Sequence, residues 1–586
     1  MPDRPTPKGD EFDHFRRSLA IWLRQNSKSM RSLAPVSLKN YETKVFICGW
    51  TIEIEERESQ FRFNVLLDSS FPFSPIRVAL PDDSKYLQWP HVEDHGVLCL
   101  PETWVPAEDL ESAIKTSLID AIDLVKNCRS DAFIAAESKK EFISYWNRGR
   151  DVSAGRLRSL LDADNGDHRF ISLWRGKKYI VVGENDKQIS QWLDHSGIDS
   201  SGPYEQAVYL SLNEGPGLPL PQAPKQFLDI LGHSAPGANS LLSRLSPFES
   251  NTFVLGAPGG AGKGLFGGYL RKVNQRGFRK GRRPPLKIIS ATWKRWSTFS
   301  RISVDRYDPG WVHGRGVSVD QNKLFDSHVV VLGCGSLGSH VAVRLAQLGI
   351  GSLTLIDPED LAASNVGRHA LGIENVGYNK ADKLALHLQR RFPHLRSIRP
   401  LHERWEEVAD EPSSALYSAD LIISCIGEWS SEANLSAWHR KTFSDIPVIY
   451  GWLGSEGATS HAVLVRSDGP SLRCLLAEDG NLKVAEATFQ NTNLIQTEPA
   501  CGTQFQPYGP LDVGHAELLV SRLCVDAIRG MINAPVHRVQ ACSTPDLIEL
   551  GGVWSKEHLE MRPEGYQGPI QFDRTFQSCG TCGQCR

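Results

Sequence analysis

The sequence predicts an α/β protein built from three parts: an N-terminal α+β domain over residues 1–150, a mixed middle domain over residues 151–305, and a doubly wound C-terminal domain over residues 306–586. Three observations lead to this prediction. A chain of 586 residues is too long for one hydrophobic core. Short runs of alternating polar and apolar residues near the N-terminus are typical of an antiparallel sheet. From about residue 311, a buried strand, a glycine turn, a helix and a second buried strand follow one another as in a βαβ unit.

Charge and composition exclude several classes of partner. The 65 basic and 68 acidic residues nearly balance, so no overall field attracts nucleic acid or a membrane surface. The N-terminus lacks the apolar core of a secretory signal, and no run of about eighteen apolar residues predicts a membrane span. Twelve cysteines are scattered through the chain, with a dense cluster at its C-terminal end, which indicates a reducing compartment. We therefore expect a cytoplasmic protein with no membrane contact and no direct nucleic-acid binding.

The N-terminal part begins with "EFDHFRRSLAIWLRQN", whose apolar residues recur at helical spacing and predict an amphipathic helix. The runs "KVFICGWTIEIEE", "FRFNVLL" and "IRVALP" then predict strands, and "PAEDLESAIKTSLIDAIDLVKNC" predicts a second helix. Between them lies Cys99, in the polar turn of "WPHVEDHGVLCLPETW". A cysteine in such a turn is a structural thiol, a metal ligand or a nucleophile.

The middle part alternates strand-like runs, such as "KKYIVVG" and "SNTFVLG", with segments rich in turn residues. In "VLGAPGGAGKGLFGG", Gly262 and Lys263 resemble part of a phosphate-binding P-loop. The match is poor, because Ala257 replaces the first glycine and Gly264 replaces the hydroxyl residue that holds magnesium. We favour a flexible loop there, and a solvated loop for the basic stretch "RGFRKGRRPPLK".

The C-terminal part contains a better nucleotide-binding pattern. Gly333, Gly335 and Gly338 follow a predicted strand and open a predicted helix, so that phosphates can approach bare backbone at the positive end of the helix. Asp357 ends the next strand about twenty residues on, where a carboxylate accepts hydrogen bonds from ribose hydroxyls. The runs "ADLIISCIG" and "IPVIYGW" predict further parallel strands.

Polar residues after Asp357 favour a triphosphate over a nicotinamide. They are Asn365, Arg368 and Lys380. With the glycines, Asp357 and the "SN..R" and "G..KA" patterns, residues 306–535 resemble the ubiquitin-activating superfamily that includes ThiF and MoeB. The resemblance implies that ATP and magnesium are used to adenylate a carboxylate. It also implies that Asp357 holds the ribose, that Asn365, Arg368 and Lys380 contact the phosphates, and that the protein is a homodimer.

One motif departs from this pattern. The family usually has "TDN" after the strand that corresponds to "ADLIISC", with its aspartate serving magnesium, whereas this chain has Ile426, Gly427 and Glu428. We expect Glu428 to take that role, and a surface glutamate is the alternative. Arg306 lies near the place where relatives offer an arginine to the ATP of the partner subunit.

The segment "TEPACGTQFQPYGPLDVGHAELLVSRL" resembles the family segment that carries a cysteine before a long helix, and Cys501 occupies that position. A thiolate attacks an acyl adenylate to give a thioester and AMP, so we expect Cys501 to be a catalytic nucleophile. A buried or metal-bound cysteine is the alternative.

The surroundings of Cys99 resemble the ubiquitin-conjugating fold, with a proline-rich exit from the sheet, a turn, a cysteine-leucine pair, a tryptophan and a helix. The family's "HPN" turn reads "WPH" here, which places His91 eight positions before the cysteine, where the family has asparagine. We expect Cys99 to be catalytic and His91 to stabilise the oxyanion formed when an amine attacks a thioester. The alternative for His91 is a structural role.

The two domains together resemble the fusion proteins encoded beside cGAS-like nucleotidyltransferases in bacterial CBASS anti-phage operons. The resemblance implies an ATP-dependent ligase that activates the C-terminus of a partner, namely the cGAS-like nucleotidyltransferase. The acyl group would pass from Cys501 to Cys99 and then to an amine-bearing target, which primes antiviral signalling. Two alternatives remain: a sulfur-carrier adenylyltransferase and a non-catalytic adaptor.

The C-terminal "SCGTCGQCR" spaces three cysteines as C-x-x-C-x-x-C, which suits tetrahedral zinc with one more thiolate. The resembled family often has a second cysteine pair, of which "SLRCLL" keeps Cys474. The expected structural zinc ligands are therefore Cys474, Cys579, Cys582 and Cys585. A disordered tail or a redox motif is the alternative.

Overall fold

The computed structural model describes most of the chain. The described residues are 9–39, 41, 46–57, 59–101, 109–148, 155–163, 165–259, 262–274, 285–313, 321–411, 413–442, 445–490, 496–497, 504–533 and 535–580. The chain forms two compact units. The first comprises Met1–Ser159, Ala163–Glu184 and Pro203–Asp305, and the second comprises Leu160–Asp162, Asn185–Gly202 and Arg306–Arg586.

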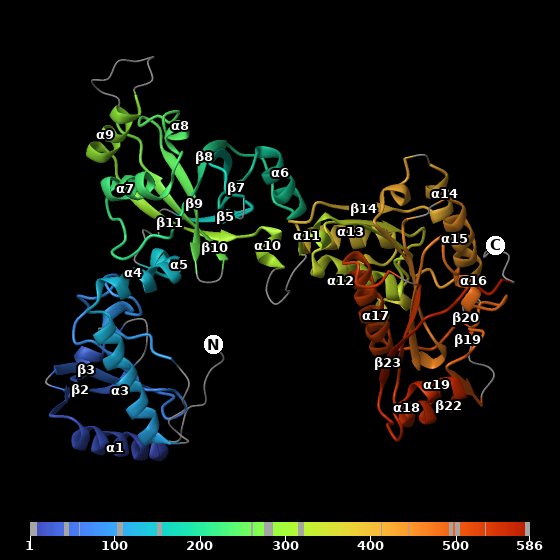
Figure 1. Ribbon diagram of the computed structural model, residues 1–586, viewed down its shortest axis with the longest axis horizontal. Coiled ribbons are helices and arrows are strands. Elements are labelled where there is room, and N and C mark those ends of the chain that lie inside the picture. The colour runs from blue at the N-terminus through green and yellow to red at the C-terminus, as the bar shows by residue number, and fades with distance from the viewer. Residues whose placement is uncertain are drawn as a thin grey trace. The chain divides into compact units, whose positions relative to one another are not determined.

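The N-terminal part of the first unit is a four-stranded antiparallel sheet with helices packed on it (Figure 1). The strands lie in the order β1 (Ser29–Ser32), β2 (Phe46–Glu56), β3 (Ser59–Asp68) and β4 (Arg77–Ala79). The helices are α1 (Gly9–Asn26), α2 (Pro35–Leu38), the 3-10 turn η1 (Asp94–Gly96) and α3 (Leu110–Asn127). Leu19 and Leu23 of α1 and Ile114 of α3 share one core with Phe63 and Val65 of β3. The α+β prediction for this part is therefore confirmed.

The middle part of the first unit is a closed seven-stranded barrel. Its strands are β5 (Arg156–Ser159), β6 (Arg169–Arg175), β7 (Ile180–Gly183), β8 (Tyr204–Ser211), β9 (Asn251–Gly259), β10 (Gly262–Leu270) and β11 (Phe299–Arg306). They close in the order β10-β11-β5-β7-β6-β8-β9. The associated helices are α4 (Asp131–Lys140), α5 (Phe142–Asn147), α7 (Pro224–Ser234), α8 (Asn239–Leu242) and α9 (Leu286–Trp296).

The barrel does not provide a P-loop. Gly262 and Lys263 begin β10, which pairs antiparallel with β9 through Gly259 and Pro258. A P-loop needs a strand, a loop and a helix in succession, so that the loop amides converge on a phosphate. Here the elements on both sides of residues 260–261 are strands, so the described part of this glycine-rich stretch lies in β9 and β10 and not in the flexible loop that the sequence favoured.

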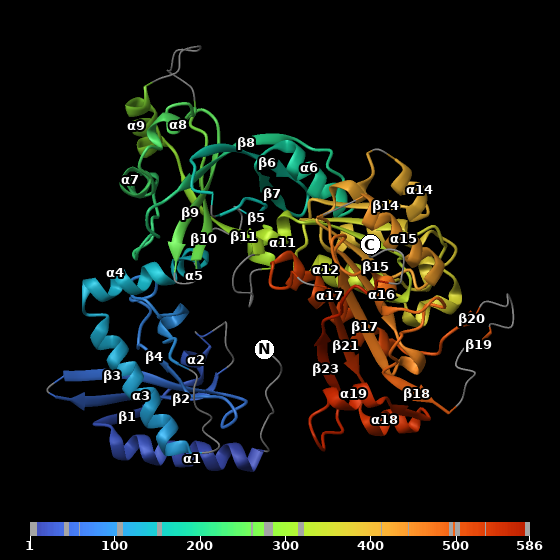
Figure 2. The ribbon, with the colours of Figure 1, turned by 45° about the vertical axis from the view of Figure 1, so that its right-hand side comes forward.

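The second unit contains an eight-stranded sheet in the order β14-β13-β12-β15-β16-β17-β21-β23 (Figure 2). The parallel strands are β12 (His328–Leu332), β13 (Ser352–Ile356), β14 (Ser397–Leu401), β15 (Leu421–Ser424) and β16 (Val448–Leu453). The antiparallel strands are β17 (Thr459–Val465), β21 (Val536–Ala541) and β23 (Ile570–Arg574).

Helices cover both faces of this sheet. The principal helices on the sheet are α12 (Ser336–Leu348), α13 (Lys380–Arg391), α14 (Trp405–Asp410), α15 (Trp429–Thr442) and α17 (Pro510–Ile528), and α6 (Asp186–His195) is a further helix of the second unit. The smaller elements are α10 (Pro309–Val312), α11 (Gln321–Asp326), η3 (Ala363–Arg368), η4 (Ile373–Asn375), η5 (Ala415–Ser418), η6 (Ser455–Gly457), α16 (Leu472–Leu475), β18 (Ala487–Phe489), β19 (Gln496–Thr497), β20 (Gln504–Phe505), α18 (Thr544–Glu549), β22 (Gly552–Trp554) and α19 (Lys556–Met561).

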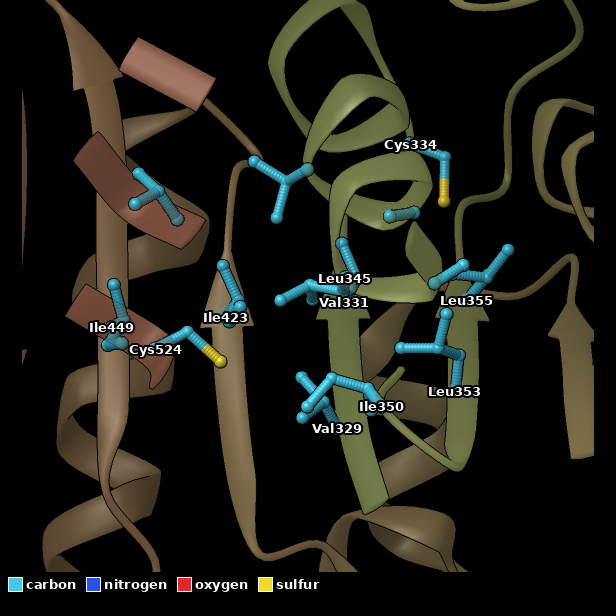
Figure 3. Packing of buried hydrophobic residues seen from close by; sticks show 14 of the residues in the cluster. Val329, Val331, Cys334, Leu345, Ile350, Leu353, Leu355, Ile423, Ile449 and Cys524 are labelled. Carbon is cyan, nitrogen blue, oxygen red and sulfur yellow. The ribbon is translucent and has the colours of Figure 1, made fainter. Parts of the chain in front are cut away.

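Alternation along β12 explains the two layers. Val329 and Val331 pack in one core with Leu345 of α12, as Figure 3 shows. Val330 and Leu332 pack in the core on the opposite face, with residues of α14 and α15. A strand buried on both faces in this way is the signature of a doubly wound sheet.

The order of the strands locates a binding crevice. The chain moves outward from β12 to β13 and β14, and then returns to place β15 on the other side of β12. In open α/β sheets, ligands bind beyond the carboxyl end of the strands at such a reversal. The carboxyl end of β12 is therefore the expected site. In the described part of the chain, no helix has the length and apolar character needed to span a membrane.

Candidate functional site

The three glycines after β12 have different structural roles. Gly333 has a φ of +82°, and a Cβ there would lie 2.8 Å from the carbonyl oxygen of Cys425. A Cβ on Gly338 would lie 1.8 Å from the carbonyl oxygen of Gly333, so the absence of a side chain lets α12 pack on the loop. A Cβ on Gly335 would meet nothing within 4 Å. Gly335 is also the N-cap of α12 and provides no side-chain cap, so bare backbone is presented at the positive helix end.

Asp357 ties the carboxyl end of β13 to this loop. Its Oδ2 accepts a hydrogen bond from the amide of Cys334 at 2.6 Å, and its Oδ1 accepts one from the amide of Glu359 at 2.8 Å. Burial raises the pKa of the Asp357 carboxyl, while the two amides and the nearby Lys380 oppose that shift. The carboxylate therefore faces the cleft from a fixed position.

Lys380 is the first residue of α13 and is buried, with 5% of its surface exposed. Its Nζ lies 2.6 Å from Oε2 of Glu359, whose side chain is 71% exposed. Glu359 is therefore the solvent-exposed partner of this pair and Lys380 the buried one. An anionic ligand in the cleft can therefore compete with Glu359 for the ammonium group.

His369 also fixes the glycine loop, through a hydrogen bond to the loop backbone. Its Nδ1 accepts a hydrogen bond from the amide of Leu371 at 3.0 Å, so its Nε2 carries the proton and donates to the carbonyl of Cys334 at 2.7 Å. Burial lowers the pKa of His369 to about 4. The neutral imidazole of His369 thus fixes Cys334 between Gly333 and Gly335. Sequence reasoning missed His369, although this histidine directly follows Arg368.

These residues surround a cleft of about 230 Å³ at the carboxyl end of β12. Its wall includes five of the predicted binding residues: Gly333, Gly335, Asp357, Lys380 and Glu428. Three others are not among its lining residues. Gly338 lies in α12 beneath the loop, and Asn365 and Arg368 lie in η3.

The two η3 residues make local contacts. Asn365 accepts a hydrogen bond from the amide of Ala362 at 3.1 Å through its Oδ1. The guanidinium of Arg368 lies 4.9 Å from the ring centre of Tyr508. The Tyr508 hydroxyl is in turn 2.8 Å from the hydroxyl of Ser336, the first residue of α12. Arg368 is therefore linked to the start of α12 through an aromatic side chain that sequence reasoning did not single out.

A second glutamate accompanies Glu428. Glu428 is exposed and accepts a hydrogen bond from the Ser430 hydroxyl at 2.7 Å. One helical turn later, the buried Glu432 accepts a hydrogen bond from the Ser424 hydroxyl at 2.9 Å and another from the backbone of Gly427. Burial raises the pKa of Glu432 to about 7. Glu432 thus braces the segment between β15 and α15 that carries Glu428, and its spacing from Glu428 was the available sequence signal.

The remaining wall of the cleft comes from α14 and α15. The indole N–H of Trp405 donates to the hydroxyl of Ser431 at 2.8 Å, and this hydroxyl donates to Glu406 at 3.1 Å. All three residues line the cleft. Their contribution was not predicted, because the residues after β14 carry no nucleotide-binding motif.

Cys99 lies at an exposed turn of the first unit. Its amide donates to the carbonyl of His91 at 2.8 Å, and the preceding Leu98 amide donates to the carbonyl of Val78 in β4. Partial burial, together with the carboxylate of Glu93, raises the pKa of the Cys99 thiol. The thiol is accessible and fixed to the sheet, and its resting form is protonated at neutral pH.

His91 adopts a left-handed conformation, with a φ of +58°. Its Nε2 lies 3.5 Å from a carboxylate oxygen of Glu137, and its Nδ1 lies 3.8 Å from one of Glu141. Its amide donates to the hydroxyl of Tyr145 at 3.2 Å. The ring thus lies between α4 and α5, on a turn whose backbone contacts Cys99.

Several predicted residues lie outside the described residues, namely Cys501, Cys582 and Cys585. Of the other two predicted zinc ligands, Cys474 is buried in α16 and Cys579 is half-buried. Within the described ranges, no group of three or more histidine, cysteine or acidic side chains is arranged to hold a metal ion.

Arg306 pairs with Asp308 of its own chain. Its Nη2 and Nε lie 2.6 Å and 2.8 Å from the two carboxylate oxygens. This bidentate contact orients the guanidinium at the end of β11.

Two parts of the chain match known family models. Residues 23–154 match Prokaryotic E2 family B, and residues 313–541 match the ThiF family. The first match contains Cys99 and His91, and the second contains the entire cleft.

The curated relatives include Cap2 proteins and a molybdopterin-synthase adenylyltransferase. The ATP-dependent ubiquitin transferase-like protein Cap2 of Enterobacter hormaechei subsp. hoffmannii is 30% identical over 166 residues, which cover 27% of this chain and 27% of the relative. Cap2 of Pseudomonas aeruginosa is 27% identical over 256 residues, covering 42% of this chain and 45% of the relative. The molybdopterin-synthase adenylyltransferase of Salmonella typhimurium is 31% identical over 157 residues, covering 26% and 61%. The chain thus spans less than half the length of the two Cap2 relatives.

Proposed function

We propose that this chain, a fusion of an E2-like domain with a ThiF-type domain, is an ATP-dependent ligase that forms two sequential thioesters. The ThiF-type domain adenylates the C-terminal carboxylate of a partner protein. Cys501 accepts the acyl group, Cys99 receives it from Cys501, and an amine takes it from Cys99. The observation that carries the proposal is the cleft, because it gathers a bare glycine loop, Asp357, Lys380 and Glu428 at one end of the sheet.

The residues of the cleft fit a nucleotide. The open space at Gly335 and the uncapped start of α12 suit phosphate oxygens, which accept hydrogen bonds from backbone amides. In this proposal Asp357 accepts hydrogen bonds from ribose hydroxyls, and Lys380 neutralises phosphate charge. Magnesium, when bound, neutralises further phosphate charge, and the exposed carboxylate of Glu428 is its proposed ligand.

The adenylation step needs positioning and charge neutralisation more than covalent catalysis. The partner's carboxylate oxygen attacks the α-phosphorus, the bond to the bridging oxygen breaks, and pyrophosphate leaves. Lys380 compensates the negative charge that develops on the phosphates. Lys380 can exchange its ion pair with Glu359 for one with phosphate, because the Glu359 side chain is exposed and easily displaced.

The thioester step assigns Cys501 to the acyl adenylate. The thiolate attacks the acyl carbon and AMP leaves with the bonding electrons. Cys501 lies seven residues before Tyr508, so a fully extended chain keeps it within about 25 Å of that residue. Tyr508 contacts Ser336 at the start of α12, and Cys501 itself lies outside the described residues.

The transfer step moves the acyl group from Cys501 to Cys99, which is exposed as a thiol acceptor must be. An amine then attacks the Cys99 thioester, and His91 stabilises the oxyanion of the tetrahedral intermediate with a ring N–H. Tethering both cysteines on one chain raises the effective concentration of each near the other.

The partners follow from the resemblance to CBASS fusion proteins. We assign the acyl donor as a cGAS-like nucleotidyltransferase, the final acceptor as a lysine amine, and the role of the ligation as priming of antiviral defence. The resemblance of the C-terminal domain to the ubiquitin-activating superfamily supports a homodimer and a structural zinc held by Cys474, Cys579, Cys582 and Cys585. The domain limits in this assignment are residues 1–150, 151–305 and 306–586.

A second candidate is the activation of a sulfur carrier. It is favoured by the similarity of part of the chain to a molybdopterin-synthase adenylyltransferase. In that case the exposed Cys99 on an E2-like fold would have no role. If the protein were a non-catalytic adaptor, the cleft and the polar residues that line it would have no role.

ATP–pyrophosphate exchange and thioester trapping separate the three functions. The protein is incubated with ATP, magnesium and a candidate partner. The ligase requires exchange together with a thiol-sensitive protein adduct that is absent in Cys501→Ala. Exchange without any protein adduct identifies the sulfur-carrier enzyme, and no exchange with any candidate identifies the adaptor.

A further inference from the structure

Helix α5 is part of the barrel as much as of the E2-like domain. Phe142 and Trp146 lie in the barrel core, where both rings contact Phe266 edge-on. The indole N–H of Trp146 donates to the carbonyl of Gly267 at 3.0 Å and to that of Ile302 at 3.2 Å. Strands β10 and β11 therefore fix the orientation of this helix.

The neighbouring residue of α5 points to the E2-like turn. The Tyr145 hydroxyl accepts a hydrogen bond from the amide of His91 at 3.2 Å and donates one to a carboxylate oxygen of Glu141 at 3.3 Å. Tyr145 is 2% exposed, and its burial raises the pKa of the phenol to about 12. The hydroxyl is therefore protonated and has both a donor and an acceptor role.

Both backbone groups of His91 are occupied. Its amide donates to Tyr145, and its carbonyl accepts from the amide of Cys99 at 2.8 Å. The φ of +58° is a sparsely populated conformation for a residue with a side chain. Such a conformation persists only when the surrounding structure determines it. The side chain of Tyr145 and these two hydrogen bonds therefore connect the barrel to the backbone of Cys99.

We propose that Tyr145 is a positioning residue for the transfer of the acyl group from Cys99 to an amine. This inference rests on the proposed function and gives the barrel a part in it. In the transfer, the amine nitrogen bonds to the acyl carbon, the carbon–sulfur bond breaks, and the amine's surplus proton goes to the departing sulfur of Cys99. The Tyr145 hydroxyl contacts none of these atoms. It holds the His91 turn, whose carbonyl accepts the hydrogen bond of the Cys99 amide, in its left-handed conformation.

Two measurements on Tyr145→Phe test this, because the variant keeps the ring and removes the hydroxyl alone. Hydrogen–deuterium exchange of the peptide that contains His91 should become at least about tenfold faster, since the amide loses its acceptor. Unchanged exchange would show that Tyr145 does not hold the turn and would overturn the proposal.

The second measurement is single-turnover discharge of the Cys99 thioester to free lysine. We expect the maximal rate constant to fall about tenfold, which corresponds to ~1.4 kcal/mol. The lysine concentration at half-maximal rate and the extent of Cys99 loading should stay unchanged. A general loss of folding would lower loading as well, so the split between loading and discharge separates positioning from stability.

Tyr209→Phe is the matched control. It removes a buried hydroxyl from the barrel, where Tyr209 donates to the carbonyl of Ala163. Discharge should match the wild type. Equal discharge in Tyr145→Phe and the wild type overturns the proposal even if exchange is faster. A wild-type protein that forms no Cys99 adduct with any partner refutes the proposed function instead, and the role of Tyr145 in transfer with it.

Discussion

Substitution of Gly338 by alanine tests the geometry of the proposed nucleotide cleft. The new Cβ would lie 1.8 Å from the carbonyl oxygen of Gly333, whereas real Cβ atoms stay beyond 3.0 Å, so α12 and the loop must separate by about 1.2 Å. Overpacking of this kind costs ~1–3 kcal/mol. A displacement of about 1 Å in a binding site lowers activity by about two orders of magnitude. We therefore expect a lower urea midpoint, weaker ATP binding, and ATP–pyrophosphate exchange slowed about 100-fold.

Two other glycines provide matched controls. Alanine at Gly335 meets nothing within 4 Å and keeps an ordinary φ of −72°, so stability should change by less than about 0.5 kcal/mol. Its methyl group nevertheless covers backbone at the cleft, so ATP binding should weaken. Alanine at Gly367 also meets nothing within 4 Å and is not a lining residue, so neither quantity should change. Equilibrium dialysis with labelled ATP measures the affinity, and urea unfolding measures the stability. Wild-type values of both in Gly338→Ala would refute the reasoning.

Three further predictions concern charge and metal. Burial raises the pKa of Glu432 from 4.5 to about 7, so its stabilising contribution is full below pH 4.5 and is lost as the pH rises to about 7. The free energy of unfolding of Glu432→Gln, relative to that of the wild type, should therefore rise by up to about 3 kcal/mol between pH 5 and pH 8 in urea unfolding. Parallel pH profiles of the two proteins would contradict this. Asp357→Asn turns an amide donor toward the Cys334 or Glu359 N–H, so ATP affinity should fall at least about tenfold in dialysis; unchanged affinity would exclude Asp357 from the site. Metal analysis of the purified protein should find about one zinc per chain, and absence of metal with freely alkylated terminal thiols such as Cys579 would remove the zinc site.

Local sequence patterns anticipated the elements around the nucleotide loop well. A buried strand, three glycines and a following helix are specified by hydrophobic periodicity and by the absence of side chains, and both act over short distances. The same local logic identified Asp357 at the end of the next strand, and the structure places it in the same cleft as Gly335. Parallel strands bring their carboxyl ends together, so residues at those ends were predictable as neighbours.

The features that sequence reasoning missed depend on contacts between distant segments. Strand patterns indicated several barrel strands, but not that β10 and β11 close the barrel against β5. Trp405 and Ser431 meet across 26 positions, and His91 and Tyr145 across 54, without any motif that links them. Periodicity shows which face of an element is buried but not which partner covers it.

The proposed transfer of the acyl group from Cys501 to Cys99 is most directly tested by trapping the acyl group on each cysteine. The full chain is incubated with ATP, magnesium and the partner protein, and the adducts are separated without reducing agent and mapped by mass spectrometry. We predict that Cys99→Ala accumulates a thioester on Cys501, and that Cys501→Ala carries none on either residue. An adduct on Cys99 that forms normally in Cys501→Ala would contradict the order of transfer, because the early cysteine would then be loaded without the late one.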